Sequence, residues 1–440
     1  MANFTSLNGI SCDSVSSING VAKASVNNIN GVESCSGHDP GPSATKLYLG
    51  YQGDEASWGA VSTFGGSVSD VTTAINTNAF QPDPSAGITA RIAYGKDGSG
   101  NPLLITVSKR DNNSLFRISA SDWAASTNNS ATQIEGPDAA NFNTNVKIRQ
   151  LEAAWGNDVW ISIGSLKEHA DDSSEANRGK RLYRSTDGGT NWNSVMLDDL
   201  SNMPRSDLEY RGARGLVTNG LGKWWIAVYD ETASPVQSMI YCSEDDGQTW
   251  ALHHTFTDTE AYYLVYTNDT LVLTYNYTGA SPSQRRAVSA AGSATSGASN
   301  WGTSVALAED GDAANDMINT NHVSSDRSSK RIAAGNGRVV CCDYQDVILL
   351  IVDGKTITVS GALTAVAGAG GIINQNITSV ATDGEGNWYI GSRPTSSTGG
   401  DIAKNTNNGD PASWAVLADN LEAPTDNDVR SMAVDRYLPV

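Results

Sequence analysis

The stretch Ser243-Glu244-Asp245-Asp246-Gly247-Gln248-Thr249-Trp250 decides the fold of this chain. Apolar runs precede and follow it, so two β runs flank one short polar turn, and this arrangement predicts a β-hairpin. Within the turn we expect Asp245 to accept hydrogen bonds from nearby backbone amides and Gly247 to adopt a positive φ. Trp250 is expected to lie on the core side of the hairpin.

The same Ser-x-Asp-x-Gly-x-x-Trp pattern occurs a second time in the chain. Its key residues are Ser185, Asp187, Gly189 and Trp192 in one copy and Ser243, Asp245, Gly247 and Trp250 in the other. Two copies at this spacing resemble the Asp-box, or BNR repeat, of sialidase-like β-propellers. The resemblance implies an all-β propeller in which these eight residues form structural turns, and it implies little about chemistry.

Hairpins of similar organisation recur at roughly 50–70 residues, a period typical of propellers and solenoids. Outer hairpins that end in tryptophan are expected at 47–58, 115–123, 182–192, 239–250, 287–301 and 402–414, and one without tryptophan at 347–359. Inner hairpins are expected at 92–107, 151–163, 216–228, 263–275, 332–342 and 379–391. Two hairpins make one four-stranded blade.

The two ends of this array are expected to meet. The run 429–435 matches the inner run 377–383 in its apolar pattern and its closing Asp, so it can complete the blade whose outer strands begin near Lys46. Such closure removes the open sheet edges. The sequence therefore predicts an all-β fold: a seven-bladed β-propeller over 46–440, closed by the C-terminal strand, with a small N-terminal β-hairpin extension.

A second kind of repeat occupies residues 1–35. Leu-Asn-Gly-Ile at 7–10 recurs as Ile-Asn-Gly-Val at 18–21 and 29–32, with a period of 11 residues. Asn-Gly between apolar residues is a strong hairpin signal, and the predicted small β meander is not stable alone. We expect this segment to dock on the main domain, on copies of itself or on another protein. Its docking residues would be Ile18, Asn19, Gly20, Val21, Ile29, Asn30, Gly31 and Val32, and residues 36–45 are a breaker-rich linker.

The repeat is similar to N-terminal repeats in structural proteins of tailed bacteriophages, particularly marine ones. This resemblance covers about 35 residues and implies a virion protein that is made in the host cytoplasm. Its expected partners are other virion proteins and a host-surface glycan, and it could form a homo-oligomer. The alternative is that the repeat only caps the propeller.

Composition and charge argue against several classes of function and several kinds of site. A formal net charge of −19 argues against a general nucleic-acid binder. No apolar run reaches 18 residues, so no membrane span is expected, and the first residues show no secretory signal. Five cysteines form no disulfide framework, although pairing of Cys12 with Cys35 stays open. No zinc-ligand spacing occurs; we expect no cofactor or metal, with Ca²⁺ binding by acidic loops left open.

Long connections should all emerge on one face of the propeller and carry any recognition site. They are 59–90, 124–148, 164–181, 193–213, 276–286, 302–330, 392–401 and 415–428. The best constellation there is Asp207, Glu209, Tyr210, Arg211 and Arg214, and Arg91, Arg149, Arg331 and Arg430 stand near inner-strand starts. Carboxylates, a tyrosine and arginines resemble the catalytic parts of a sialidase. The competing interpretation is that they pair with acids in solvated loops.

We expect a non-enzymatic virion protein, a component of the tail, fibre or head decoration. The chain lacks an Arg-Ile-Pro motif, because Ala93 follows Arg91 and Ile92, and sialidases typically have six blades. Two alternatives stay open. One is a glycan-active enzyme of the sialidase or glycoside hydrolase kind, and the other is a seven-bladed Asp-box assembly factor, which would need a targeting segment.

Overall fold

A computed structural model describes the chain in segments. The described residues are 6–7, 10–11, 17–18, 21–22, 28–29, 32–33, 46–52, 57–61, 71–75, 89–108, 115–125, 132–134, 150–164, 181–196, 212–230, 233–279, 284–294, 300–307, 331–342, 346–365, 377–392, 401–410, 413–418 and 428–435. The chain divides into two compact units, Met1–Pro42 and Ser43–Val440. The predicted boundaries at 35 and 45 stay predictions.

The first unit contains paired strands at each copy of the Asn-Gly repeat. The strands are β1 (Ser6–Leu7), β2 (Ile10–Ser11), β3 (Ser17–Ile18), β4 (Val21–Ala22), β5 (Asn28–Ile29) and β6 (Val32–Glu33). Leu7 pairs with Ile10, Ile18 with Val21, and Ile29 with Val32, all antiparallel. Each pair of described strands is a separate two-stranded sheet, so the repeat forms single hairpins and not one continuous meander.

The second unit is built from four-stranded antiparallel sheets, and six of them use four consecutive strands each. The first three are β10 (Thr89–Lys96), β11 (Pro102–Ser108), β12 (Leu115–Ser119) and β13 (Thr132–Gln133); β14 (Gln150–Gly156), β15 (Val159–Gly164), β16 (Arg181–Ser185) and β17 (Asn193–Met196); and β18 (Gly212–Thr218), β19 (Trp224–Asp230), β20 (Gln237–Ser243) and β21 (Ala251–Thr257).

The next three sheets continue the same order along the chain. They are β22 (Thr259–Thr267), β23 (Thr270–Tyr277), β24 (Gln284–Ala291) and β25 (Val305–Ala306); β26 (Ile332–Gly335), β27 (Arg338–Cys342), β28 (Asp346–Asp353) and β29 (Thr356–Ala365); and β30 (Ile377–Thr382), β31 (Trp388–Ser392), β32 (Ile402–Asn405) and β33 (Trp414–Ala418). Each sheet pairs only neighbours in sequence, as expected for successive hairpins.

One further sheet joins the two ends of the unit. The C-terminal strand β34 (Asp428–Val434) pairs antiparallel with β7 (Leu47–Gln52), and β8 (Ser57–Val61) and β9 (Val71–Ile75) follow outward. Six blades are thus continuous in sequence, and this ring-closing blade takes strands from both ends. The Asp435 carboxylate fixes the junction, because its Oδ1 accepts a 2.8 Å hydrogen bond from the Lys46 amide. The predicted all-β propeller, closed by the C-terminal strand, is confirmed.

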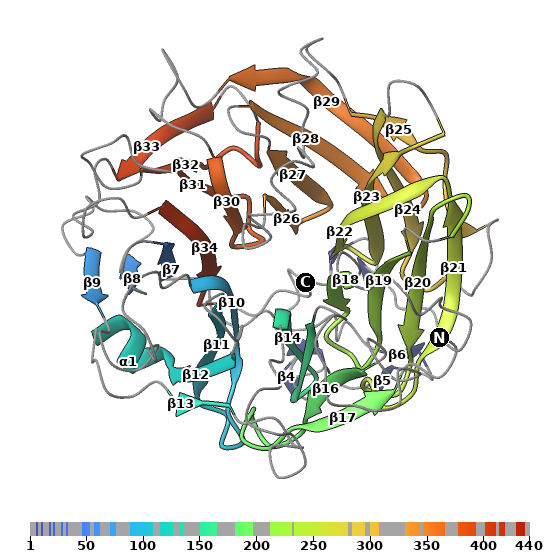
Figure 1. The fold of residues 1–440 in the computed structure, drawn as a ribbon. Coiled ribbons are helices and arrows are strands. Elements are labelled where there is room, and N and C mark those ends of the chain that lie inside the picture. The colour runs from blue at the N-terminus through green and yellow to red at the C-terminus, as the bar shows by residue number, and fades with distance from the viewer. Residues whose placement is uncertain are drawn as a thin grey trace. The chain divides into compact units, whose positions relative to one another are not determined.

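The first strand of every sheet lies nearest the centre of the ring, and we call these seven strands, β34, β10, β14, β18, β22, β26 and β30, the inner strands (Figure 1). Neighbouring inner strands contact one another in that order, and β30 contacts β34 again. The last strands, such as β13, β17 and β33, lie at the rim in Figure 1. The inner strands therefore enclose a central channel.

Two predicted outer hairpins are wrong. Range 47–58 spans β7 and β8, the second and third strands of their sheet, because β34 supplies only one strand and β9 completes the sheet within the predicted connection 59–90. Range 115–123 is β12 followed by helix α1 (Ala120–Ala125). Ser119 Oγ accepts a 3.0 Å hydrogen bond from the Asp122 amide, which is the bond of a helix N-cap.

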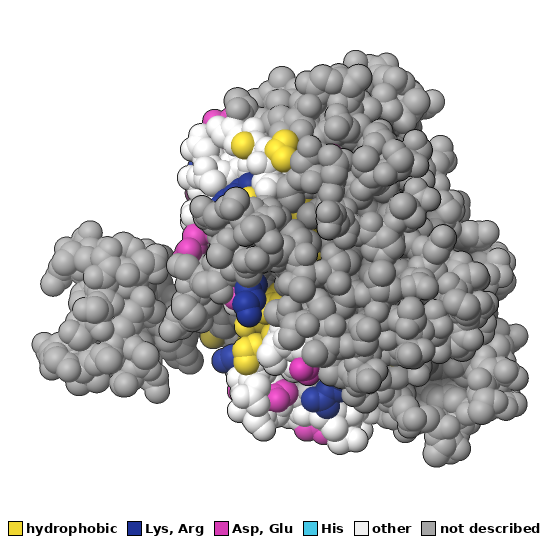
Figure 2. Space-filling view, turned by 90° about the vertical axis from the view of Figure 1, so that its left-hand side faces the viewer, with side chains coloured by type: hydrophobic (Ala, Val, Ile, Leu, Met, Phe, Trp, Pro, Cys, Tyr) yellow, Lys and Arg dark blue, Asp and Glu magenta, His cyan; other side chains and the backbone are white. Residues whose placement is uncertain are grey.

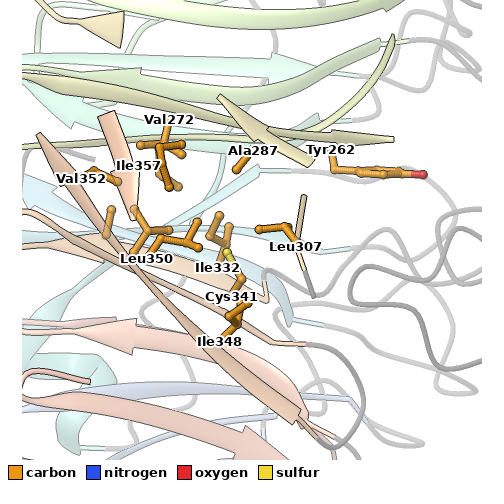
Figure 3. Packing of buried hydrophobic residues seen from close by; sticks show 13 residues of the cluster. Tyr262, Val272, Ala287, Leu307, Ile332, Cys341, Ile348, Leu350, Val352 and Ile357 are labelled. Carbon is orange, nitrogen blue, oxygen red and sulfur yellow. The ribbon is translucent and has the colours of Figure 1, made fainter. Parts of the chain in front are cut away.

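Apolar side chains from facing sheets form the core between blades. One cluster joins the β22–β25 sheet to the β26–β29 sheet. Figure 3 shows Val272 and Ala287 on one side and Ile332, Cys341 and Leu350 on the other. Burial of these side chains is the main force that holds adjacent blades together. Among the described residues no helix is long and apolar enough to cross a membrane.

Candidate functional site

The two Ser-x-Asp-x-Gly-x-x-Trp turns have the same hydrogen-bond pattern. In the turn between β20 and β21, the Ser243 hydroxyl donates to Asp245 Oδ1 at 2.8 Å and accepts from the Gly247 amide at 2.9 Å. Asp245 Oδ1 also accepts from the Thr249 amide at 2.8 Å. The Trp250 indole Nε1 donates to the Gly247 carbonyl at 3.1 Å. Each key side chain is therefore engaged within its own turn.

The turn between β16 and β17 repeats these bonds. Ser185 donates to Asp187 Oδ1 at 2.8 Å and accepts from the Gly189 amide at 3.0 Å. Trp192 Nε1 donates to the Gly189 carbonyl at 3.0 Å. Burial alone would raise the pKa of Asp187, but hydrogen bonds from Asn191, Ser185 and Thr190 outweigh it and lower the pKa. The carboxylate is thus an ionised acceptor that serves the turn.

A third turn of this kind, between β32 and β33, was not recognised in the sequence. Asn405 takes the place of the serine, because its Oδ1 accepts from the amides of Asn407 at 2.8 Å and Gly409 at 3.2 Å. Asn408 and Gly409 have φ of 54° and 80°, close to the 57° and 77° of Asp246 and Gly247. The signal was present as Asn-x-Asn-x-Gly, with the same spacing as Ser-x-Asp-x-Gly. Asn407, at the position of the aspartate, donates from its Nδ2 to Asp410 Oδ2 at 3.1 Å and so does not replace the carboxylate as an acceptor.

The central channel contains a cavity of about 130 Å³ that all seven inner strands line. Its walls are mostly apolar, with Ala93, Ala154, Ala334, Ala381 and Ala433 among the described lining residues. The larger side chains of Tyr94, Trp155, Tyr266 and Met432 also belong to the lining. Because alanines from five inner strands project so little, space is left where larger side chains would fill the channel.

One buried ion pair stands in the wall of this cavity. Arg91 Nη1 lies 2.9 Å from Glu152 Oε2, and the two side chains are only 12% and 7% exposed. Arg91 belongs to β10 and Glu152 to the neighbouring inner strand β14. Glu152 neutralises the guanidinium, so the pair presents a polar but nearly uncharged group to the cavity.

Irregular pairing at the start of the inner strands sets the position of this pair. Register shifts occur between Thr89 and Arg91 in β10 and between Gln150 and Glu152 in β14. Similar shifts are found in β18, β22, β30 and β34. A β-bulge redirects the side chain that follows it. Arg91 and Glu152 therefore occupy equivalent positions on adjacent strands, immediately after the bulges.

The predicted constellation falls largely outside the described residues. Asp207, Glu209, Tyr210 and Arg211 all lie outside them, and Arg214 is described only as part of the backbone of β18. How these side chains lie is therefore outside the described part of the chain, and their role in ligand binding stays a prediction. The predicted docking residues Asn19, Gly20, Asn30 and Gly31 lie outside as well, whereas Ile18, Val21, Ile29 and Val32 are in strands β3 to β6.

Of the arginines predicted near the inner-strand starts, only some have a described side chain. Arg91 lines the central cavity and Arg331, next to β26, is 7% exposed. Arg149 lies outside the described residues, and for Arg430 only the backbone of β34 is described. Glu152 was missed as a site residue, although it follows the register shift of β14 as Arg91 follows that of β10. Comparison of equivalent repeat positions could have found it.

The described surface has no patch of one charge in the view of Figure 2, where acidic, basic and apolar side chains are mixed. Within the described segments, no group of three or more His, Cys, Asp or Glu side chains is placed to hold a metal ion. What the described geometry offers is therefore a rigid ring with an apolar central cavity and one buried polar pair.

Comparisons with known proteins give the fold alone. No family model matches the chain, and no curated protein matches it. A hypothetical selenium-binding protein from Sulfolobus tokodaii is 9% identical, with a TM-score of 0.49 over 89% of this chain and 94% of that one. The β-propeller domain of the Trilobed protease from Pyrococcus furiosus is 10% identical, with a TM-score of 0.45 over 87% and 97%. Penicillium chrysogenum α-L-arabinanase is 11% identical, with a TM-score of 0.41 over 79% and 92%.

Proposed function

We propose that this chain is a non-enzymatic structural protein of a tailed-bacteriophage particle, docked through its N-terminal repeat and displaying the propeller for binding. The observation that carries the proposal is the placement of one hairpin at each copy of the 11-residue repeat. Leu7 and Ile10, Ile18 and Val21, and Ile29 and Val32 are the directly paired residues of successive hairpins.

A hairpin with two paired residues on each strand is too small to be stable in water without a partner surface. Repetition at a constant interval presents the same apolar pair three times, which suits a partner that is itself repetitive. The assembled shell, tail or fibre of a virus is such a partner. The resemblance of the repeat to phage structural proteins supports the same assignment.

The net charge is distributed unequally between the two units, which supports separate roles for them: docking by the first unit and display by the second. Residues 1–42 contain one Lys or Arg and three Asp or Glu, for a net charge of −2, so 43–440 carry the remaining −17 of the total −19. A nearly neutral segment can approach another protein without strong repulsion, whereas the acidic propeller stays solvated. The propeller's closed ring gives a rigid support for variable loops, which are the usual place for binding.

The shared turn pattern supports an Asp-box origin for the propeller, and under this proposal its function there is structural. The carboxylates of Asp187 and Asp245 are occupied by hydrogen bonds within their own turns. They are therefore poorly suited to act on a ligand.

The test compares particles assembled with the full chain and with a chain lacking residues 1–42. We expect the truncated chain to fold, with unchanged β circular dichroism, but to be lost from purified particles in a quantitative immunoblot. A matched variant with Ile18, Val21, Ile29 and Val32 changed to serine should be lost in the same way. Full incorporation of the truncated chain would overturn the docking role.

A second assay addresses enzymatic activity directly. Purified protein is incubated with host surface polysaccharide, and released reducing sugar is measured. We expect no release. Release that disappears in Glu209→Gln or Tyr210→Phe would instead establish a glycan-active propeller.

A further inference from the structure

We propose that the central cavity binds one small, uncharged and largely apolar molecule, about the size of a benzene ring, whose oxygen accepts a hydrogen bond from Arg91. This inference is independent of the docking role. It rests on the size of the cavity, on the character of its lining and on the state of the Arg91–Glu152 pair.

The size of the cavity sets the class of ligand. Its volume of about 130 Å³ is close to the roughly 150 Å³ of an engineered apolar protein cavity that stays dry and takes up benzene. A water molecule is poorly stabilised in a mostly apolar space, because a buried water needs two to four polar hydrogen-bond partners. A compact apolar molecule removes both its own surface and the cavity wall from water, so its binding is favourable.

The lining favours a ring over a polar molecule. Ala154 is 2% exposed, and Ala334 and Ala381 are each 7% exposed, so the small residues are firmly part of the buried wall. Tyr94, Trp155 and Tyr266 add aromatic rings at the equivalent positions of three inner strands. Aromatic side chains pack well against a planar apolar ligand.

Arg91 supplies the polar contact. Its Nη1 is used by Glu152, but its Nε is buried without a hydrogen-bond partner among the described residues. A buried donor left without a partner costs about 1–3 kcal/mol. An acceptor oxygen on the ligand would remove that cost, so the ligand should carry such an oxygen.

The charge of the ligand follows from Glu152. Its carboxylate lies 2.9 Å from Arg91 Nη1 and already balances the guanidinium. A ligand carboxylate in the same cavity would place a second negative charge near Glu152, and Arg91 is the one cationic side chain among the described lining residues. An aryl ether or a similar neutral acceptor therefore fits, whereas an aromatic acid does not.

The experiment uses three matched probes with the full chain: anisole, ethylbenzene and benzoate. Anisole and ethylbenzene have the same number of non-hydrogen atoms and differ by the ether oxygen. Dissociation constants are measured by calorimetry, and contact is checked by saturation-transfer NMR. We expect anisole to bind about 3- to 10-fold more tightly than ethylbenzene, the value of one hydrogen bond, and benzoate to bind more weakly than either.

Variants separate the cavity from the rest of the protein. Ala93→Leu, at a half-buried lining position of β10, enlarges a side chain that borders the cavity and should weaken both neutral probes at least tenfold, and Ala433→Leu on β34 does the same if the first variant fails to fold. Ala251→Leu, at an exposed position of β21, is the control and should bind like the wild type. The double variant Arg91→Met with Glu152→Gln should still bind ethylbenzene but lose the preference for anisole.

Several outcomes would overturn the proposal. These are no binding of either neutral probe to the wild type, unchanged binding in the folded Ala93→Leu or Ala433→Leu variant, equal affinity for anisole and ethylbenzene, or tighter binding of benzoate. Circular dichroism and thermal unfolding establish that each variant is folded before its affinity is compared.

Discussion

Asn157 donates a 2.8 Å hydrogen bond from its Nδ2 to Oδ1 of Asp246, and the two residues belong to different blades. Asn157 lies in the turn between β14 and β15, whereas Asp246 lies in the turn between β20 and β21. Arg184 of the first blade adds a 2.6 Å bond from its Nε to the Asp246 carbonyl. The turn that decided the fold therefore also connects its blade to the preceding one.

This connection predicts an energetic coupling between Asn157 and Asp246. Both have positive φ, 49° and 57°, so glycine removes either side chain without backbone strain. In a double-mutant cycle with Asn157→Gly and Asp246→Gly, we expect a coupling of about 0.5–1.5 kcal/mol in the free energy of unfolding, measured in urea. The pair Asn336→Gly with Asp246→Gly is the control and should show none; equal couplings would contradict the prediction.

Removal of the Asp245 carboxylate should destabilise the propeller. Asp245→Ala leaves the amides of Gln248 and Thr249 and the Ser243 hydroxyl without their acceptor. We expect a loss of about 1–3 kcal/mol in the free energy of unfolding. Glu244→Ala is the neighbouring control, because the Glu244 side chain is 78% exposed and its 3.1 Å ion pair with Lys223 contributes little, less than about 1 kcal/mol.

The same carboxylate should make stability depend on acid pH. Burial acts to raise the pKa of Asp245, but bonds from Thr249, Ser243 and Gln248 prevail and lower it below the ordinary value of 3.8. The contribution is therefore present above pH 3.8 and lost as the pH falls through the lower folded-state pKa. Asp245→Asn should reduce this part of the acid sensitivity in urea titrations. An unchanged pH profile would count against it.

Much of the fold could be predicted because the hairpin signals are local. Asp-Gly and Asn-Gly turns between apolar runs identify strand pairs such as β30 and β31, and the match of 429–435 to 377–383 correctly predicted ring closure. The short helix α1 was missed because Trp123 follows an apolar strand there as well. That segment, Ala120-Ser121-Asp122-Trp123, contains no glycine for a positive-φ turn, and Ser119 caps a helix instead.

The candidate site was less predictable, since it depends on contacts between repeats. Arg91 and Glu152 are 61 residues apart in sequence and meet only when β10 and β14 lie side by side. The cavity arises from alanines on five strands, and alanine in an apolar run gives no signal of its own. Only alignment of equivalent positions in the inner strands could reveal either feature.

Two adjacent histidines on β21 should make stability fall as the solution becomes mildly acidic. Burial is the main cause that lowers the pKa of both His253 and His254 below 6.5. His253 Nε2 lies 3.2 Å from the Ala294 carbonyl, and the His254 ring stacks on Trp301 at 6.0 Å. Lys223 acts to lower and Glu244 to raise the pKa of His253.

The direction in which the free energy of unfolding changes with pH follows from the difference in proton binding between the folded and unfolded states. Because the folded-state pKa of each histidine is lower than 6.5, the unfolded chain binds more protons than the folded protein near and below that pH, so stability decreases as the pH falls from 7 toward 5. The variant His253→Gln with His254→Gln should show a flatter decrease in the free energy of unfolding over this range. Parallel pH profiles of the variant and the wild type would show that the histidines play no part.

Two glycines have similar backbone φ angles but different neighbouring atoms, so they give a matched test of how closely adjacent blades pack. Gly188 and Gly100 have φ of 69° and 82°. A Cβ on Gly188 would overlap the backbone nitrogen of Gly98 in the preceding blade, whereas a Cβ on Gly100 meets nothing within 4 Å. Gly100→Ala should therefore cost only the positive-φ penalty of about 1–2 kcal/mol. Gly188→Ala adds a clash with backbone that cannot move without separating the two turns, so we expect a loss of more than about 3 kcal/mol, measured in urea. Equal losses in the two variants would mean that the turns of adjacent blades do not pack as closely as the structure places them.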